Sequence, residues 1–264
     1  MVHGWPRYKD AGTLKLLLES LDRFAPWADV YLVVAMPSQV PDYVDKKKVR
    51  IIYHKDFIPE SIGGCVFQSN AIESFIGRMN LPERFVWMND DIVFLHEVNE
   101  EKFFGGDIPK HTFSFEKKNK NFWSYGWNVS NFQLLFQDAE PKVLKTQHGP
   151  TPLRMSWCRE MYERYEDRIM SSVGSVVERQ DGQINQLAYS LYQYWYKSTF
   201  ESTMSGVCVN PHTRISNALF DNDWICINEN TKFDSSNIIR MTGDFLHGKV
   251  RRDKTIRGRL IKRF

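Results

Sequence analysis

The sequence has few cysteines and no long hydrophobic run. Its four cysteines, among 264 residues, are too far apart to form a CxxC pair, a spacing typical neither of a zinc site nor of a disulfide scaffold. We expect reduced thiols in a cytoplasmic protein. No apolar run approaches the roughly 18 residues that span a bilayer, and no secretory signal is recognisable. Internal repeats and low-complexity linkers are also absent from the sequence.

The excess of positive charge is concentrated near residue 264. The net charge of the whole sequence is +3, whereas residues 249–264 contain eight basic residues and one aspartate. The remaining residues therefore carry a net charge of −4, which argues against a nucleic-acid-binding surface. We predict that the basic tail, residues 249–264, makes peripheral contact with an anionic membrane, most of its apolar residues gathering on one side of a helix. A solvated basic end is the alternative.

The apolar residues follow patterns that predict both helices and strands. A hydrophobic content of 42% is enough for a sizeable core. Helical spacing and short β-branched runs alternate over the first hundred residues, which indicates an α/β fold with parallel strands. The predicted helices are about Gly12 to Phe24, Ser69 to Met79, Leu153 to Met170 and Ile184 to Tyr196. The predicted strands are Val30 to Ala35, Val49 to Tyr53, Phe85 to Met88 and Trp224 to Ile227, the last of which is expected to rejoin the sheet.

The segment Asn89-Asp90-Asp91 directly follows a predicted strand. Ligands of open α/β sheets bind beyond the carboxyl ends of strands. Adjacent carboxylates at such a place can hold Mg²⁺ or Mn²⁺, which in turn bridges the phosphates of a nucleotide sugar. A solvated acidic turn is the competing interpretation.

Three further segments carry polar side chains with a possible chemical role. Asn70 and Glu73 lie at the start of a predicted helix, where capping explains them as well as sugar binding does. His148 precedes Gly149-Pro150 in a loop and can act as a general base near neutral pH, or can simply be a polar loop residue. Arg179 can bind phosphate oxygens, or can belong to a solvated charge cluster at a helix start.

Together these segments resemble the Stealth family, which includes bacterial capsule polymerases that transfer hexose-1-phosphate and the animal N-acetylglucosamine-1-phosphotransferase. Their order and spacing carry the resemblance, which covers most of Arg7 to Asp91 and is patchy beyond. The blocks that match the family's second region are Arg7 to Asp10 with Leu14, Ser20 to Trp27, Val30 to Val34, Gln39 to Pro41, Val49 to His54, Phe67 to Glu73 and Phe85 to Asp91. Later blocks are His148 with Pro150, Pro152 and Leu153, then Arg179, then Cys226 to Glu229.

The sequence also departs from the family pattern. The family's first conserved region, a strand that ends in a turn with a key aspartate, has no counterpart, since only six residues precede Arg7. Glu19 stands where an arginine is usual, and Glu229 stands where an aspartate is usual. A chain that starts natively at Met1 is therefore expected to lack part of the nucleotide pocket and a catalytic carboxylate.

The resemblance implies a Rossmann-like core with a mainly parallel sheet and added helices. It implies one transferase domain over residues 1–248, with an α/β half at 1–100 and an irregular, helical half at 101–248, followed by the tail at 249–264. The implied reaction moves a sugar-1-phosphate from a UDP-sugar to a hydroxyl of a glycan or lipid-linked glycan acceptor, in a cytoplasmic or peripheral protein. An ordinary glycosyltransferase that releases UDP, or an inactive scaffold subunit, are the alternatives.

The resemblance also implies roles for individual residues. Asn89, Asp90 and Asp91 would hold a divalent metal, Mg²⁺ or Mn²⁺. The implied catalytic residues are Asp90, His148 as the base on the acceptor hydroxyl, and Arg179 as a stabiliser of phosphoryl charge. The implied substrate-binding residues are Arg7, Asp10, Asn70 and Glu73.

Overall fold

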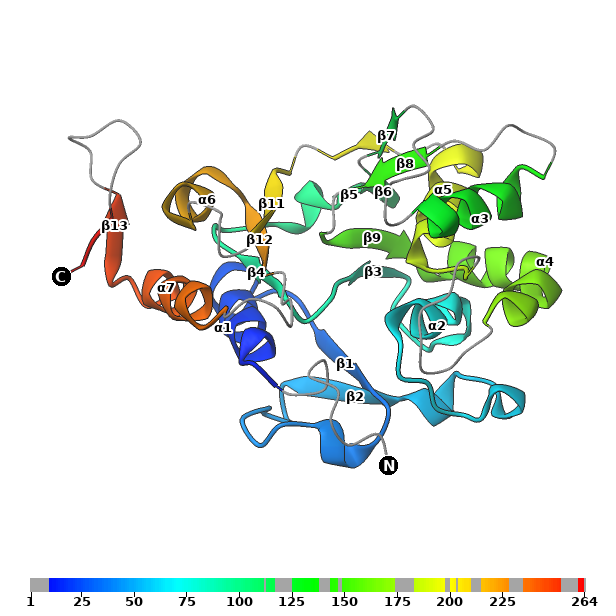
Figure 1. Ribbon diagram of the computed structural model, residues 1–264, viewed down its shortest axis with the longest axis horizontal. Helices are drawn as coiled ribbons and strands as arrows, with labels where there is room; N and C mark the ends of the chain where they lie inside the picture. Colours follow the sequence, from blue (N-terminus) through cyan, green and yellow to red (C-terminus); the bar gives the residue numbers. More distant parts are fainter. Residues whose placement is uncertain are drawn as a thin grey trace.

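The computed structural model describes residues 10–263 of the chain, except for several segments. The segments outside this description are residues 112, 117–124, 138–142, 147–148, 174–182, 198–199, 203, 210–214, 228–234 and 253–260. Helices and strands are both present throughout the described part, so the fold is a mixed one (Figure 1).

The helices and strands have the following bounds. The α-helices are α1 (Thr13–Phe24), α2 (Ser69–Ser74), α3 (Tyr125–Leu135), α4 (Met155–Ser172), α5 (Gln186–Tyr196), α6 (Ile215–Asp221) and α7 (Ser236–Leu246), and η5 (Ile76–Arg78) is a 3₁₀ turn. The first strands are β1 (Val30–Val34), β2 (Val49–Tyr53), β3 (Arg84–Trp87), β4 (Ile92–Phe94), β5 (Phe104–Gly105), β6 (Ile108–His111) and β7 (Phe113–Glu116). The later strands are β8 (Val143–Thr146), β9 (Thr151–Arg154), β10 (Phe200–Glu201), β11 (Gly206–Val209), β12 (Trp224–Ile227), β13 (Val250–Arg252) and β14 (Ile261–Arg263).

One core forms around the three-stranded sheet β11-β12-β4. Strand β12 pairs parallel with β11 and antiparallel with β4, and all of its residues are buried, as are those of β4. Residues of α1, α6 and α7 belong to the same apolar cluster, and these helices lie beside the sheet (Figure 1). The predicted late strand at 224–227 is thus confirmed, and it joins β4 across more than 120 residues of sequence.

A second core forms between helices on the other side of the molecule. Helices α2, α4 and α5 pack around η5, where Gly77 approaches α4 closely. A β-carbon on Gly77 would lie 2.5 Å from Cβ of Tyr162 and 2.6 Å from the backbone oxygen of Cys158. The Tyr189 hydroxyl, fully buried nearby, donates to the Ser74 oxygen at 2.6 Å. Glycine is therefore required at the point where η5 touches α4.

The strands form several small sheets, so the predicted single, mainly parallel sheet is not observed. Strands β1 and β2 pair parallel over five residues, from Val30 with Val49 to Val34 with Tyr53. Strand β3 pairs antiparallel with β9, and the remaining described pairs are of both kinds. The prediction failed because the pattern of one strand shows that it is buried but not which strand lies beside it.

Two local predictions also need correction. The helix predicted over Ser69 to Met79 ends as an α-helix at Ser74 and continues as the η5 turn. In the basic tail, β13 and β14 pair antiparallel, so the described parts of the tail are strands and the predicted helix is wrong there.

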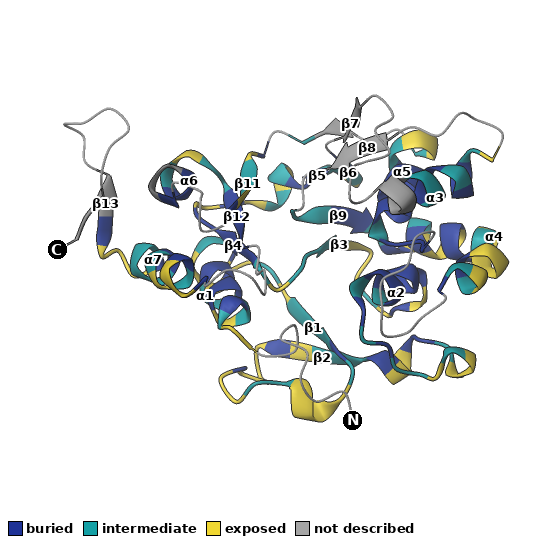
Figure 2. Cartoon of the chain, viewed as in Figure 1, coloured by how far each residue is buried: buried dark blue, intermediate teal, exposed yellow. Residues whose placement is uncertain are grey.

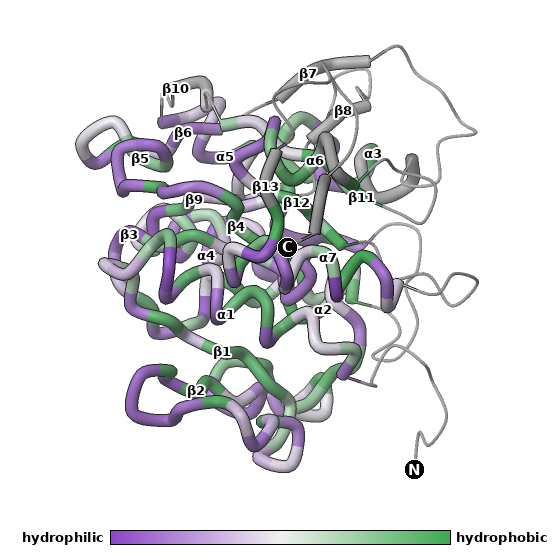
Figure 3. Tube along the Cα trace, turned by 90° about the vertical axis from the view of Figure 1, so that its left-hand side faces the viewer, coloured by the Kyte–Doolittle hydropathy of each residue, from purple (hydrophilic) through white to green (hydrophobic). Residues whose placement is uncertain are grey.

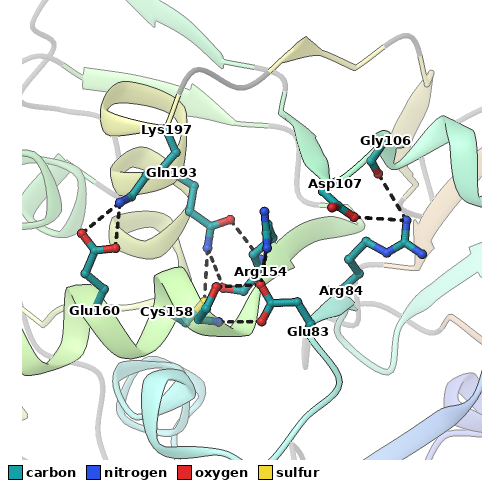
Figure 4. A network of polar contacts seen from close by, with 10 residues as sticks. Glu83, Arg84, Gly106, Asp107, Arg154, Cys158, Glu160, Gln193 and Lys197 are labelled. Carbon is teal, nitrogen blue, oxygen red and sulfur yellow. Dashed lines mark hydrogen bonds and ion pairs between the residues drawn. The ribbon is translucent and has the colours of Figure 1, made fainter.

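Glu83 joins β3, β9 and α4 through a polar network (Figure 4). Its carboxylate accepts hydrogen bonds from Arg154 Nε at 2.7 Å and from the backbone nitrogen of Ser156 at 3.0 Å. Burial opposes ionisation of Glu83, but the hydrogen bonds from Ser156 and Arg154 outweigh it and lower the pKa of the carboxyl. In the same view Lys197 binds Glu160 and Gln193 contacts Arg154 and Cys158. These contacts fix the start of α4 against the end of β9.

His54 is expected to make the fold sensitive to acid. Its ring is buried against Phe57, and burial lowers the pKa of His54 to about 4. Because the unfolded chain keeps the ordinary pKa near 6.5, it binds the proton more readily between these two values. The free energy of unfolding should therefore fall by up to about 3 kcal/mol as the pH drops from about 6.5 to about 4.

Urea unfolding at pH 7 and pH 4.5 measures this loss. The decrease should be smaller in His54→Phe, whereas His111, which is also buried with its pKa lowered to about 3, still contributes in both proteins. An equal decrease in the two proteins would show that His54 is not responsible.

Candidate functional site

The Asn89-Asp90-Asp91 segment is the turn between β3 and β4. The backbone nitrogen of Ile92 donates to the Asn89 oxygen at 3.4 Å, and the nitrogen of Ile227 donates to the Asp91 oxygen at 2.7 Å. The turn therefore connects a strand of the β3-β9 sheet to a strand of the β11-β12-β4 sheet, and its position at the carboxyl end of β3 is the one predicted.

Asp90 lies at the mouth of a cavity of about 700 Å³. The Asp90 residue is exposed to solvent there, yet enough protein surrounds its carboxyl group that desolvation raises the pKa of Asp90. The charges of Asp91 and Asp10 raise the pKa of Asp90 further. Three carboxylates thus concentrate negative charge at one place, and a bound cation would relieve their repulsion.

Asp10 is held beside Asp90 by a contact that the sequence analysis missed. The Tyr43 hydroxyl donates to Asp10 Oδ2 at 2.8 Å, and Asp10 Oδ1 accepts from the backbone nitrogen of Gly12 at 2.8 Å. Burial, the Asp10 hydrogen bond and the charges of Asp10 and Asp90 raise the pKa of Tyr43 well above its usual range. Tyr43 therefore stays a neutral donor at physiological pH. No local pattern marks Tyr43, because 33 residues separate it from Asp10.

Asp91 is turned toward the β11-β12-β4 sheet. The Cys226 thiol donates to Asp91 Oδ2 at 3.3 Å. Cys226 lies on β12 and is buried. A hydrogen bond with Cys208, burial and the neighbouring Asp91 charge raise the pKa of the Cys226 thiol, so it remains protonated and can donate. The two adjacent aspartates therefore have different surroundings, one open to solvent and one held by a thiol.

Asn70 and Glu73 are not helix caps, contrary to one of the two interpretations of that segment. The N-cap of α2 is Gln68, and both Asn70 and Glu73 are buried. The side chain of Asn185 donates to Asn70 Oδ1 at 3.4 Å, and the backbone nitrogen of Gln186 donates to Glu73 Oε2 at 3.4 Å. Both residues thus bind the start of α5, while Glu73 also lines the 700 Å³ cavity.

Three of the predicted site residues lie outside the described part of the chain. They are Arg7, His148 and Arg179. Gly149 is described, and a β-carbon there would lie 2.2 Å from the Trp224 ring, so the segment after His148 packs against β12. The structure thus brings Asp10, Asn89, Asp90 and Asp91 together and places Glu73 on the wall of the same cavity.

The donor set of the turn suits a hard cation with few protein ligands. Within residues 10–263, as far as they are described, no group of three or more His, Cys, Asp or Glu side chains is arranged to hold a metal ion. Mg²⁺ usually takes one or two carboxylates and completes its coordination with water and substrate phosphates. The exposed carboxylate of Asp90, beside Asn89 on the cavity wall, fits that mode of binding, whereas Asp91 is turned toward the sheet. This arrangement does not fit a closed, all-protein site.

No helix in the described part of the chain combines the length and the apolar character needed to cross a membrane.

Comparison with known proteins places the turn within a conserved region. Residues 7–111 match the family model of Stealth protein conserved region 2. A capsular polysaccharide phosphotransferase of Streptococcus thermophilus is 34% identical over 108 residues, which are 39% of this chain and 44% of the relative. An exopolysaccharide phosphotransferase of Streptomyces coelicolor is 34% identical over 102 residues, which are 37% of this chain and 17% of the relative.

A mammalian relative matches in the same way. The N-acetylglucosamine-1-phosphotransferase subunits alpha/beta of Mus musculus are 33% identical over 101 residues, 37% of this chain and 8% of the relative. The chain thus covers less than half the length of each of these relatives. Over residues 7–111, which are less than half of its length, this chain is thus similar to the Stealth proteins.

Proposed function

We propose that this chain transfers a sugar-1-phosphate from a UDP-sugar to a hydroxyl of a glycan acceptor in polysaccharide synthesis. The acceptor oxygen forms a bond to the β-phosphorus, the bond from that phosphorus to the bridging oxygen breaks, and UMP leaves. The observation that carries the proposal is the acidic turn. Asn89 and Asp90 line a cavity, with Asp91 beside them, within the region shared with relatives named as polysaccharide phosphotransferases.

The acidic turn has the role of a phosphate-facing site in this proposal. Asp90 and Asp91, with Asn89, would hold Mg²⁺ or Mn²⁺, and such an ion neutralises a diphosphate when bound. Asp10 contributes further negative charge beside Asp90 and is fixed by Tyr43. With Arg7, it belongs to the proposed substrate-binding residues.

Asn70 and Glu73 are proposed to bind or position the sugar from the side of α2. Glu73 lies on the cavity wall, whereas Asn70 is buried against Asn185. Glu73 therefore has the more direct access to a ligand. Asn70 is better placed to hold α2 and the start of α5 together.

His148 is proposed as the base that takes the acceptor proton, with Arg179 stabilising charge on the phosphoryl oxygens. Replacement of His148 by alanine should lower kcat by about 10²-fold, because a positioned base contributes at least that much, with little change in the KM for the donor. Steady-state kinetics measure both constants. His96→Ala, at an exposed position beside Phe245, is the control and should keep normal kcat. Normal turnover by His148→Ala together with a lower melting temperature would assign His148 a structural role instead.

The basic tail is proposed to attract an anionic membrane. Residues 249–264 carry a net charge of +7, and basic residues near an anionic leaflet contribute about 1 kcal/mol each. Co-sedimentation with anionic vesicles should be stronger for the full chain than for a chain that ends at Gly248. It should also weaken with salt, because the Debye length falls from about 10 Å at 0.1 M to about 3 Å at 1 M. Equal sedimentation of the two chains would rule out this role.

The nucleotide product tests the reaction class. The chain is incubated with UDP-hexoses, a glycan acceptor and Mg²⁺ or Mn²⁺, and the nucleotides are separated by chromatography. Release of UMP supports sugar-1-phosphate transfer. Release of UDP indicates a glycosyltransferase that breaks the bond between sugar and oxygen, and release of neither indicates a scaffold subunit.

A further inference from the structure

Two cysteines lie side by side on the neighbouring strands β11 and β12. These strands pair parallel, and Cys208 is the direct partner of Cys226 in their register. Both are free thiols, and their side chains are hydrogen-bonded to each other. The sheet therefore brings together two sulfur atoms that the sequence keeps apart.

The two thiols lie on the same face of the sheet. The residues that flank them belong to, or pack against, the apolar cluster shared with α6 and α7, and they are Val207, Val209, Ile225 and Ile227. Because successive side chains of a strand alternate between the two faces, Cys208 and Cys226 both lie on the other face. Trp224 agrees with this assignment. It lies two residues before Cys226, and its ring lies directly over Gly206, two residues before Cys208.

The two thiols differ in their access to solvent. Cys208 is exposed on β11, at the edge of the described sheet, whereas Cys226 is buried on β12. Figure 2 shows β12 as the more buried of the two strands, and Figure 3 shows it as a largely hydrophobic stretch of the trace. A small oxidant in water can therefore reach Cys208 first and finds Cys226 directly beside it. An accessible cysteine next to a second, resolving cysteine is the usual arrangement of a redox-sensing pair.

The spacing of the two strands allows a disulfide bond. Neighbouring strands lie about 4.8 Å apart, and the Cα atoms that a disulfide joins usually lie about 4.4 to 6.8 Å apart. Cys208 and Cys226 are direct partners, so their Cα atoms meet this requirement. Closure then needs rotation of the two side chains, with β11 and β12 remaining paired.

Cys226 also connects this pair to the acidic turn. Its thiol donates to Asp91 Oδ2 at 3.3 Å, and the backbone nitrogen of Ile227 donates to the Asp91 oxygen at 2.7 Å. A disulfide sulfur carries no proton, so oxidation of Cys226 removes the first of these hydrogen bonds and leaves the second. A disulfide would thus release Asp91 Oδ2 from the thiol while the turn stays attached to β12 through its backbone.

We propose that Cys208 and Cys226 are a peroxide-sensitive thiol pair, and that closure of their disulfide releases Asp91 Oδ2 from its thiol donor. The Cys208 sulfur attacks one oxygen of hydrogen peroxide, the O–O bond breaks, and Cys208 becomes a sulfenic acid as water leaves. The Cys226 sulfur then attacks the Cys208 sulfur, and the hydroxyl group leaves with the Cys226 proton as a second water. Each cysteine loses one electron and one proton, and the peroxide takes up both electrons.

Peptide mass spectrometry of the full chain tests closure without any measurement of activity. The reduced protein is treated with hydrogen peroxide, its remaining thiols are blocked with N-ethylmaleimide, and it is digested without reductant. The peptides that contain Cys208 and Cys226 should be joined, and dithiothreitol should separate them. Cys158, fully buried in the other core, should keep its free thiol. Absence of the joined peptides, or a disulfide between two chains in their place, would overturn the proposal.

Serine variants test the order of the two steps. In Cys226→Ser the sulfenic acid on Cys208 has no thiol to react with, so its labelling by dimedone should rise by at least about tenfold over the wild type. Cys65→Ser is the control and should form the disulfide at the wild-type rate, since Cys65 takes no part in either step. If dimedone labels Cys226 in Cys208→Ser as strongly as it labels Cys208 in Cys226→Ser, the exposed cysteine is not the one that reacts first, and the proposed order is wrong.

Binding of Mn²⁺ measures the release of Asp91, and this part rests on the proposed function. A hydrogen bond of this kind contributes about 1 kcal/mol, so its loss should let the oxidised protein bind Mn²⁺ at least about threefold more tightly than the reduced protein. Cys226→Ala, which removes the donor without a disulfide, should match the oxidised protein, and Cys226→Ser, which keeps a donor, should match the reduced one. Free Mn²⁺ is measured by electron paramagnetic resonance. Equal affinity in all four proteins would overturn the release of Asp91. Failure of all four to bind Mn²⁺ would contradict both the release and the proposed metal site, whereas the joined peptides alone decide whether the thiol pair exists.

Discussion

Replacement of Asp90 by asparagine is expected to lower turnover by about 10³-fold or more while leaving the fold intact or slightly more stable. The loss follows because the site would bind a divalent ion and phosphate less well. The gain in stability follows from the raised pKa of Asp90 in the folded protein. Folding favours the protonated carboxyl, so ionisation of Asp90 above its unfolded pKa costs stability. Asparagine avoids that cost.

Two measurements check this expectation on the same samples. Turnover is measured with Mg²⁺ or Mn²⁺ and again after chelation, which should reduce wild-type activity to the level of the variant. Thermal unfolding without metal should give an equal or higher melting temperature for Asp90→Asn. Asp42→Asn is the control, because Asp42 is exposed beside Tyr43. A double variant, Asp90→Asn with Asp91→Asn, is the decisive case. If it keeps metal-dependent turnover at the wild-type level, this turn is not the metal site.

Gly77→Ala is expected to destabilise the protein by about 3 kcal/mol. The added β-carbon would lie 2.5 Å from Cβ of Tyr162 and 2.6 Å from the backbone oxygen of Cys158, so η5 and α4 must separate. Overpacking of this kind typically costs about 1 to 3 kcal/mol, and we expect the upper end because a backbone oxygen cannot rotate away. The same separation disturbs the hydrogen bond from the Gly77 nitrogen to the Tyr189 hydroxyl.

Gly243→Ala is the matched control for this loss. Gly243 lies inside α7, and a β-carbon there would meet only Leu16 Cδ2, at an ordinary distance of 3.5 Å. Because alanine is favoured over glycine in helices by about 1 kcal/mol, this variant should be neutral or more stable. Chemical denaturation of both variants measures the difference. If Gly77→Ala unfolds at the same urea concentration as the wild type, the close packing of η5 on α4 is wrong.

Local patterns in the sequence predicted individual elements well. Apolar spacing placed the helix that becomes α1, and β-branched runs placed β1, β2 and β3 nearly at their observed bounds. Partners of the strands were not predictable in the same way. Strand β9, which pairs with β3, has the sequence Thr-Pro-Leu-Arg. Its first two residues precede the helix predicted over Leu153 to Met170, and its last two fall inside it. Its pairing depends on contacts across more than 60 residues, which no short window contains.

The candidate site was predictable to a similar extent. Asp90 and Asp91 follow a strand as predicted, and that position suggested a ligand site, with a solvated acidic turn as the competing interpretation. The contact between Tyr43 and Asp10 is a matter of tertiary structure and left no trace in the sequence pattern. Asn70 and Glu73 fitted a capping pattern, yet the N-cap is Gln68, two residues before Asn70, and the side chains of Asn70 and Glu73 bind the start of α5. The catalytic roles of His148 and Arg179 stay predictions, because both residues lie outside the described part of the chain.

The most direct test of the account follows the β-phosphate of the donor. UDP-hexoses labelled with ³²P at the β-phosphate are incubated with a glycan acceptor, Mg²⁺ and either the wild-type chain or Asp90→Asn. If Asn89-Asp90-Asp91 is the site of sugar-1-phosphate transfer, the label appears in the acceptor as a phosphodiester, unlabelled UMP is released, and the variant transfers almost none. Label that remains in UDP, or equal transfer by the wild type and the variant, would contradict it.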